Sequence, residues 1–126
     1  MHKFRVLVVD DFQRWQDFVC AALQEVVNLE VVGVASDGTE AIDKAAGLHP
    51  DLVVLDISLP TMTGIEVARC ISRVSPESAI VFLTENCSSE VREECLRAGA
   101  SGYVVKSSAG ADPIPAISSA LRREPS

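Results

Sequence analysis

Two apolar runs that end in acidic residues constrain the fold of this chain more than any other feature. Residues 6–9 lead into Asp10 and Asp11, and residues 52–55 lead into Asp56. Apolar runs of this length, rich in β-branched residues, are typical of strands buried on both faces of a parallel sheet. We therefore expect the three Asp to lie outside the core, at the carboxyl edge of such a sheet, where open α/β folds bind their ligands.

Strand-like and helix-like segments alternate along the whole sequence. The expected strands are residues 4–9, 29–35, 52–55, 79–83 and 102–105. The expected helices are residues 12–27, 38–47, 63–74, 88–98 and 113–123, from the spacing of their apolar residues and from Gly and Pro near their ends. This alternation implies right-handed crossovers and one parallel sheet with helices on both faces.

The composition excludes several classes of protein. A chain of 126 residues is long enough for one domain with a core, and we expect residues 1–126 to form a single domain. The net charge of −7, without a basic run, argues against direct binding of nucleic acid. No apolar run approaches the roughly 18 residues that cross a bilayer, and no secretory signal precedes the first strand. We expect a soluble, cytoplasmic protein, either complete as it stands or part of a longer one.

The four cysteines are widely spaced and form no Cys-x-x-Cys pair. They are Cys20, Cys70, Cys87 and Cys95. This spacing favours buried or half-buried free thiols over a zinc site or a set of disulfides.

Polar residues follow four of the five expected strands. They are Asp10 and Asp11 after the first strand, Asp56 after the third, Thr84 after the fourth and Lys106 after the fifth. Carboxylates that meet at one edge repel one another, and a cation between them relieves that repulsion. A hard divalent cation such as Mg²⁺ prefers oxygen ligands and keeps several waters. Carboxylates at this edge, a backbone carbonyl just beyond the third strand and waters would satisfy it.

The same residues suit phosphoryl transfer to a carboxylate. A carboxylate held between Mg²⁺ and the Lys106 ammonium is a nucleophile toward a phosphoryl group and would give an aspartyl-phosphate. The two cations would stabilise negative charge on the transferred group, and Thr84 would donate a hydrogen bond to one of its oxygens. Each residue alone also has an ordinary structural explanation, as a helix cap, a turn former, a strand end or a loop charge. The joint pattern favours the chemical interpretation.

At these residues the sequence resembles the CheY-like receiver domain of two-component response regulators. The segments that carry the resemblance are residues 8–11, 50–56, 59–64, 83–84 and 102–106. They span nearly the whole chain. The resemblance implies a flavodoxin-like, doubly wound (βα)5 fold with sheet order 2-1-3-4-5. Two further segments, residues 37–41 and 62–66, resemble regulators with a LuxR-type helix-turn-helix output.

The resemblance also implies roles for the residues of the site. Asp56 would be the phosphoacceptor. Asp11, Asp56 and the Ser58 carbonyl would bind Mg²⁺ directly, and Asp10 would bind it through water. Lys106 would contact the phosphate.

In that family the position of Thr84 and that of Tyr103 form a coupled switch pair. The phosphodonor would be a sensor histidine kinase or a phosphotransfer protein. A homodimer would use the face formed by residues 88–98, 102–105 and 113–123. The protein would be a regulator that catalyses its own phosphorylation and dephosphorylation, and not a turnover enzyme.

Three other functions are less well supported. An aspartyl-phosphate phosphatase generally needs an acid two residues beyond the nucleophile, where Ser58 stands. A flavin carrier would suffer repulsion between its phosphate and Asp10 and Asp11. An interaction module that works without phosphorylation would not need the complete set of site residues. One departure from the family pattern is Glu85, where a small residue is usual, and we expect it to slow phosphorylation by small anionic donors.

Overall fold

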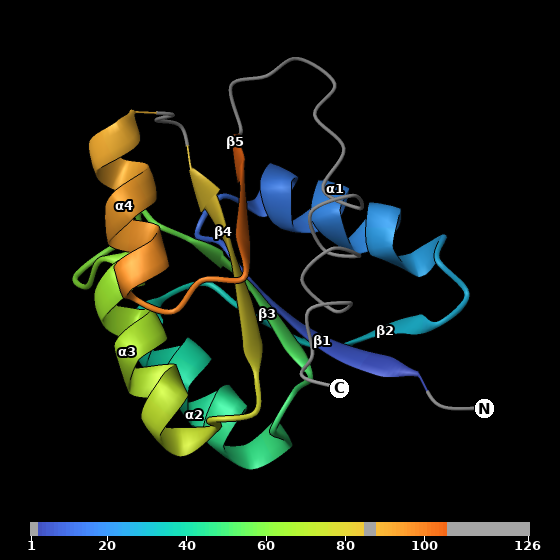
Figure 1. Ribbon diagram of the computed structural model, residues 1–126. Helices are drawn as coiled ribbons and strands as arrows, with labels where there is room; N and C mark the ends of the chain where they lie inside the picture. The colour runs from blue at the N-terminus through green and yellow to red at the C-terminus, as the bar shows by residue number, and fades with distance from the viewer. Residues whose placement is uncertain (1–2, 85–87, 106–126) are drawn as a thin grey trace.

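The computed structural model describes residues 3–84 and 88–105 of the chain (Figure 1). The strands are β1 (Phe4–Val9), β2 (Leu29–Ala35), β3 (Leu52–Asp56), β4 (Ala79–Thr84) and β5 (Gly102–Val105). The helices are α1 (Gln13–Gln24), α2 (Gly38–Leu48), α3 (Gly64–Val74) and α4 (Ser89–Arg97). The helix expected at residues 113–123 lies outside the described residues. None of the helices described has the length and apolar character to cross a membrane.

The strands form one parallel sheet in the order β2-β1-β3-β4-β5, which confirms the predicted flavodoxin-like topology. Helix α1 packs on one face of this sheet, and α2, α3 and α4 pack on the other (Figure 1). Parallel strands need crossover connections, and because the crossover helices here cover both faces of the sheet, the fold is doubly wound.

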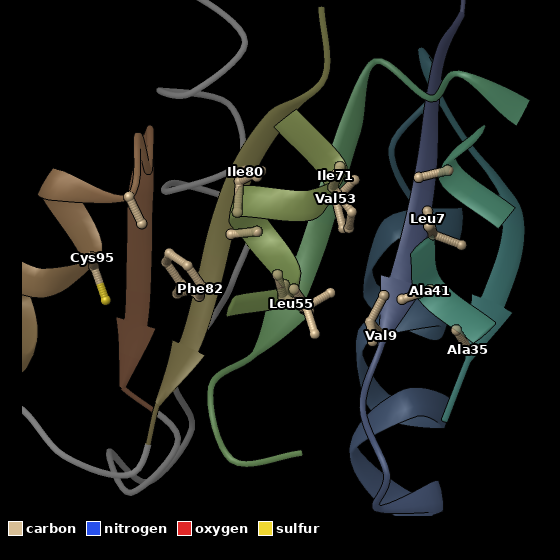
Figure 2. Close-up of a cluster of buried hydrophobic side chains, with 14 residues drawn as sticks. Leu7, Val9, Ala35, Ala41, Val53, Leu55, Ile71, Ile80, Phe82 and Cys95 are labelled. Atoms are coloured by element: carbon tan, nitrogen blue, oxygen red, sulfur yellow. The ribbon is translucent and has the colours of Figure 1, made fainter. Parts of the chain in front are cut away.

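Alternate residues of the central strands enter two separate cores. Val6 and Val8 of β1 pack with Val19 and Leu23 of α1. The intervening residues Leu7 and Val9 enter the core beneath α2, α3 and α4. Figure 2 shows side chains of this core. Side chains of a strand point alternately to the two faces of a sheet, so a strand covered on both faces needs an unbroken apolar run. This explains why the sequence shows continuous apolar runs instead of alternating ones.

Side-chain caps define the starts of three helices. Asp37 accepts a hydrogen bond from the Glu40 N–H (2.8 Å), and Ser88 accepts one from the Val91 N–H (3.3 Å). Thr63 and Glu66 form a reciprocal capping box at the start of α3. Short polar side chains at this position satisfy N–H groups that have no partner within the helix.

The first helix is shorter than the predicted residues 12–27. Phe12 is its N-cap, and the helix ends at Gln24. Beyond it the Val26 N–H donates to the Leu23 carbonyl at 3.0 Å in a tighter turn, and Val27 is exposed. Val26 still packs against the core beneath α1, so the sequence shows an apolar residue where a longer helix would also place one. Apolar spacing alone does not distinguish these two arrangements.

Gly64 allows the start of α3 to lie against the segment that follows β3. Its N–H donates to the Ile57 carbonyl at 2.7 Å. A Cβ at this position would lie 2.6 Å from the Ile57 Cα and still closer to the Asp56 carbonyl oxygen. Since backbone atoms cannot move aside as a flexible side chain does, only glycine fits here without displacing the loop behind Asp56.

We expect Gly64→Ala to lower the free energy of unfolding by about 1–3 kcal/mol, the usual cost of overpacking. Gly47→Ala is a matched control, because Gly47 lies in α2 with no atom within 4 Å of an added Cβ. The control should raise the free energy of unfolding by about 0.5–1 kcal/mol through helix propensity. Urea denaturation measures both, and equal changes in the two variants would contradict the close approach.

Candidate functional site

Three carboxylates meet at the carboxyl edge of the sheet. One side-chain oxygen from each of Asp10, Asp11 and Asp56 lies within 4.8 Å of those of the other two. The register explains this meeting, because Val9 pairs with Leu55 across β1 and β3 and the next residues along are Asp10 and Asp56. The predicted juxtaposition of these three residues is thus present.

Two of these carboxylates are buried, contrary to our expectation that strand-end acids lie outside the core. Asp10 is 0% exposed and Asp56 is 3% exposed, whereas Asp11 is exposed. The reason is partly that β3 runs one residue further than predicted, so that Asp56 pairs with Leu83 inside the sheet. Thr84 is likewise the last residue of β4 and not a residue beyond it, and it is buried.

Backbone N–H groups hold both buried carboxylates. The Phe12 N–H donates to Asp10 Oδ1 at 2.9 Å, and the Ser58 N–H donates to Asp56 Oδ1 at 3.0 Å. Each bond joins an Asp to the residue two positions later, the pattern of an Asx turn. The two loops therefore bend back over their carboxylates, which fixes the side-chain oxygens while the chain leaves the sheet. Ser58 lies in the second of these loops, directly beside Asp56.

The predicted switch residues lie on neighbouring strands. Thr84 pairs with Val105 across β4 and β5, and Tyr103 is half-buried on β5 against the core beneath α2, α3 and α4. The Arg92 guanidinium of α4 lies over the Tyr103 ring, 5.6 Å from its centroid. Tyr103 thus has the apolar core on one side and a cation of α4 on the other.

Some predicted residues fall outside the part of the chain that the structure describes. Lys106 and Glu85 are among them, so the contact of Lys106 with a phosphate and the effect of Glu85 on phosphorylation stay predictions. The same holds for residues 113–123, the last part of the predicted dimer face.

The thiols that the structure describes are free. Cys95 is buried, and Cys20 and Cys70 are half-buried, as predicted; Cys87 lies outside the described residues. Burial raises the pKa of Cys20, with a smaller contribution from Asp17. Burial likewise raises the pKa of Cys95, with Glu94 adding to the shift. A raised pKa keeps a thiol protonated at neutral pH, which makes it a poor nucleophile or metal ligand.

Gln16 was not among the predicted site residues, but it is a buried polar residue of α1 whose amide contacts the backbone beside the carboxylates. Its position in the sequence could have indicated that it is buried. Gln16 precedes Val19 and Leu23 by three and seven residues, so it occupies the apolar stripe of the helix. A polar residue in such a stripe indicates a buried hydrogen-bonding partner.

Comparisons with known proteins agree with this geometry. The family model described as "Response regulator receiver domain" matches residues 6–117. The response regulator GacA of Pseudomonas viridiflava is 35% identical over 113 residues, which cover 90% of this chain and 53% of that protein. The transcriptional regulatory protein LiaR of Bacillus subtilis is 34% identical over 121 residues, which cover 96% of this chain and 57% of that protein. This chain therefore spans just over half the length of each of these relatives.

A solved structure agrees as well. A two-component response regulator of the LuxR family from Aurantimonas sp. SI85-9A1 superposes with a TM-score of 0.89 at 32% identity, over 95% of this chain and 86% of that one. The predicted resemblance, including the similarity to LuxR-type regulators, is confirmed. With the sheet order, the strand-end acids and the match over residues 6–117 in agreement, this chain belongs to the receiver domain family of two-component response regulators.

Proposed function

We propose that this chain is a signalling switch that accepts a phosphoryl group on Asp56 in a Mg²⁺-dependent reaction. Membership of the receiver family supports a phosphoaccepting role. The observation that carries the assignment is the cluster of Asp10, Asp11 and Asp56 at the carboxyl edge of the sheet. The donor would be a phosphohistidine of a sensor histidine kinase or of a phosphotransfer protein.

The residues of the cluster fit Mg²⁺. Three carboxylates with oxygens within 4.8 Å of one another offer the hard oxygen ligands that this ion prefers. In our proposal Asp11, Asp56 and the Ser58 carbonyl would bind the ion directly, and Asp10 would bind it through water. When bound, the ion would neutralise charge on the phosphoryl oxygens during transfer.

In the transfer of the phosphoryl group, Asp56 would act as the nucleophile and become covalently phosphorylated. A carboxylate oxygen of Asp56 attacks the phosphorus, and the bond from phosphorus to the donor imidazole nitrogen breaks. The electron pair of that bond stays on the nitrogen, and water later cleaves the acyl phosphate. Thr84 and Lys106 would contact the phosphoryl oxygens. Because the phosphorylated state is the signal, this chemistry describes a regulator and not a turnover enzyme.

Asp11→Asn tests the metal site through stability. Without a divalent cation, removal of one of three like charges should raise the free energy of unfolding by about 1 kcal/mol, since Asp11 is exposed. With Mg²⁺ in excess the wild type should gain stability by ligand binding, and Asp11→Asn should gain far less. Urea denaturation with Mg²⁺ and with a chelator measures both effects. Asp43→Asn, which removes an exposed charge from α2, should show the wild-type response to Mg²⁺. An equal gain in Asp11→Asn would refute the metal site.

Asp56→Asn tests the phosphoacceptor. Incubation with acetyl phosphate and Mg²⁺ should add one phosphoryl group, about 80 Da, to the wild type and to the Asp43→Asn control. The intact mass of Asp56→Asn, or of the wild type with a chelator, should not change. A phosphoryl group that persists in Asp56→Asn would assign the reaction to another residue. An absence of any phosphorylation in the wild type would favour an interaction module that works without it.

We propose further that Thr84 and Tyr103 pass the phosphorylation state to α4 and β5. A hydroxyl hydrogen bond to a charged phosphoryl oxygen contributes about 1.5–3 kcal/mol, which shifts a two-state equilibrium roughly 10- to 100-fold. Movement of Thr84 toward the phosphate would open space beside β5 for the Tyr103 ring. The ring would then turn inward and leave the Arg92 guanidinium that it now contacts.

Thr84→Val tests this coupling, because valine keeps the shape of threonine and removes the hydroxyl. Beryllofluoride with Mg²⁺, which mimics the phosphoryl group, should shift the amide signals of Tyr103 and of residues 89–97 in the wild type. In Thr84→Val the shifts should stay confined to the neighbourhood of Asp56. Thr39→Val, on the exposed side of α2, is the matched control and should behave as the wild type. Full-size shifts at Tyr103 in Thr84→Val would show that the hydroxyl is not the link.

We also propose that residues 1–126 act as one receiver unit in the cytoplasm. GacA and LiaR are longer than the region that matches this chain, and a longer protein that contained this unit would carry its output outside these residues. A homodimer through α4, β5 and residues 113–123 stays a prediction.

A further inference from the structure

Gln16 is a buried amide on the face of α1 that packs against the sheet. Its residue is 4% exposed, and it shares that face with the fully buried Val19 and Leu23. A buried amide is destabilising unless hydrogen bonds replace those it makes to water. The two N–H groups of the Gln16 side chain meet three acceptors. Nε2 donates to the Asp10 carbonyl at 2.6 Å, and it lies 3.1 Å from both the Ala35 carbonyl and Ser36 Oγ, which share its second N–H.

The shortest of these bonds holds the peptide that joins Asp10 to Asp11. The Asp10 N–H donates to the Ala35 carbonyl at 3.1 Å, and Asp10 Oδ1 accepts from the Phe12 N–H at 2.9 Å. With the Gln16 bond, Asp10 is held at its N–H, its carboxylate and its carbonyl. Because a peptide group is planar, fixing the Asp10 carbonyl also fixes the direction in which the chain enters Asp11.

We propose that Gln16 is a positioning residue of the acidic site and sets the spacing between the Asp10 and Asp11 carboxylates. Asp11 is exposed, so its position relative to Asp10 depends on the backbone between them. Gln16 ties that backbone to the end of β2 through Ala35 and Ser36, on the side of the loop away from Asp56. The inference rests on the proposed Mg²⁺ site, since its consequence is the affinity of that site for the ion.

A purely structural role for Gln16 predicts a different result. The Asp10 and Ala35 carbonyls lie where the β1–β2 ladder ends, and any donor that satisfied them would stabilise the fold. On that account a change at Gln16 lowers stability and leaves the metal affinity of the folded protein unaltered. On our account both fall, because the partners that orient metal-binding groups affect metal affinity about 10- to 100-fold.

The test is the dissociation constant of Mg²⁺ in Gln16→Met, which keeps the length of the side chain and removes its donors. The constant is measured from amide shifts of Asp10 and Asp11 during a titration with Mg²⁺, below the melting temperature of each variant. We expect it to rise about tenfold or more over the wild type. Val19→Ala is the matched control, because it perturbs α1 in the same core one turn later and leaves the loop bonds intact. Its dissociation constant should stay within about twofold of the wild type.

The outcomes separate the two proposals. A Gln16→Met protein that melts earlier but binds Mg²⁺ as the wild type does would overturn the positioning role while leaving the metal site intact. A wild type that shows no binding would overturn the proposed function itself. If Gln16→Met does not fold, Gln16→Asn serves in the same comparison, since its amide stays polar but is one methylene too short to reach the Asp10 carbonyl.

Discussion

Repulsion among three carboxylates at the end of a buried sheet is the constraint on which the rest of the structure depends. Two unit charges 4 Å apart repel by about 1 kcal/mol in water and by about 4 kcal/mol at an effective dielectric constant of 20. Asp10 and Asp56 are both buried, so they are screened less than the exposed Asp11. Hydrogen bonds from Phe12 and Ser58 offset part of this repulsion. A divalent cation would offset the rest. The repulsion among the carboxylates is therefore also the reason for the proposed metal site.

The two loops that carry the carboxylates are held from opposite faces of the sheet. On one face, Gln16 of α1 binds the carbonyl of Asp10. On the other face, Gly64 at the start of α3 binds the carbonyl of Ile57, directly after Asp56. Each of these hydrogen bonds uses a backbone carbonyl of the loop and no carboxylate oxygen. The site thus depends on the packing of both helices, although neither helix supplies a carboxylate to it.

Much of this arrangement could be predicted from the sequence, because it rests on local patterns. Segments rich in apolar and β-branched residues predicted every described strand within one residue at each end, although Arg5 interrupts β1 and Glu30 interrupts β2. Short polar residues before apolar stripes predicted the starts of α2, α3 and α4. The order of the strands came from the resemblance to receiver domains, since local patterns do not encode which strands are neighbours. The three-carboxylate cluster was predicted from the strand ends alone, because the carboxyl ends of parallel strands lie at one edge of the sheet.

Other features depend on tertiary contacts, which local patterns do not encode. The burial of Asp56 arises because β3 continues beside β4 for one residue more. The spacing of Val26 fits a longer helix, but α1 ends before it, and Val26 packs against the core from the following loop. The apolar stripe of α1 indicates that Gln16 is buried, but it does not indicate which groups Gln16 binds, because its three acceptors are 6, 19 and 20 residues away along the chain. The role of a residue cannot be predicted from local sequence patterns when its hydrogen-bonding partners lie on other strands or loops.

In the proposed switch, the surroundings of Tyr103 would allow phosphorylation of Asp56 to change the surface of α4. The ring packs against the core on one side and contacts the Arg92 guanidinium on the other. An exposed cation–π contact contributes only about 0.5–1 kcal/mol. A new hydrogen bond from Thr84 to a phosphoryl oxygen would exceed that contribution. Because the contact to be given up is weaker than the bond to be formed, the proposed switch needs no large rearrangement of the sheet. Arg92, which is already exposed on α4, would lose its contact with the ring, and a partner could bind the changed surface.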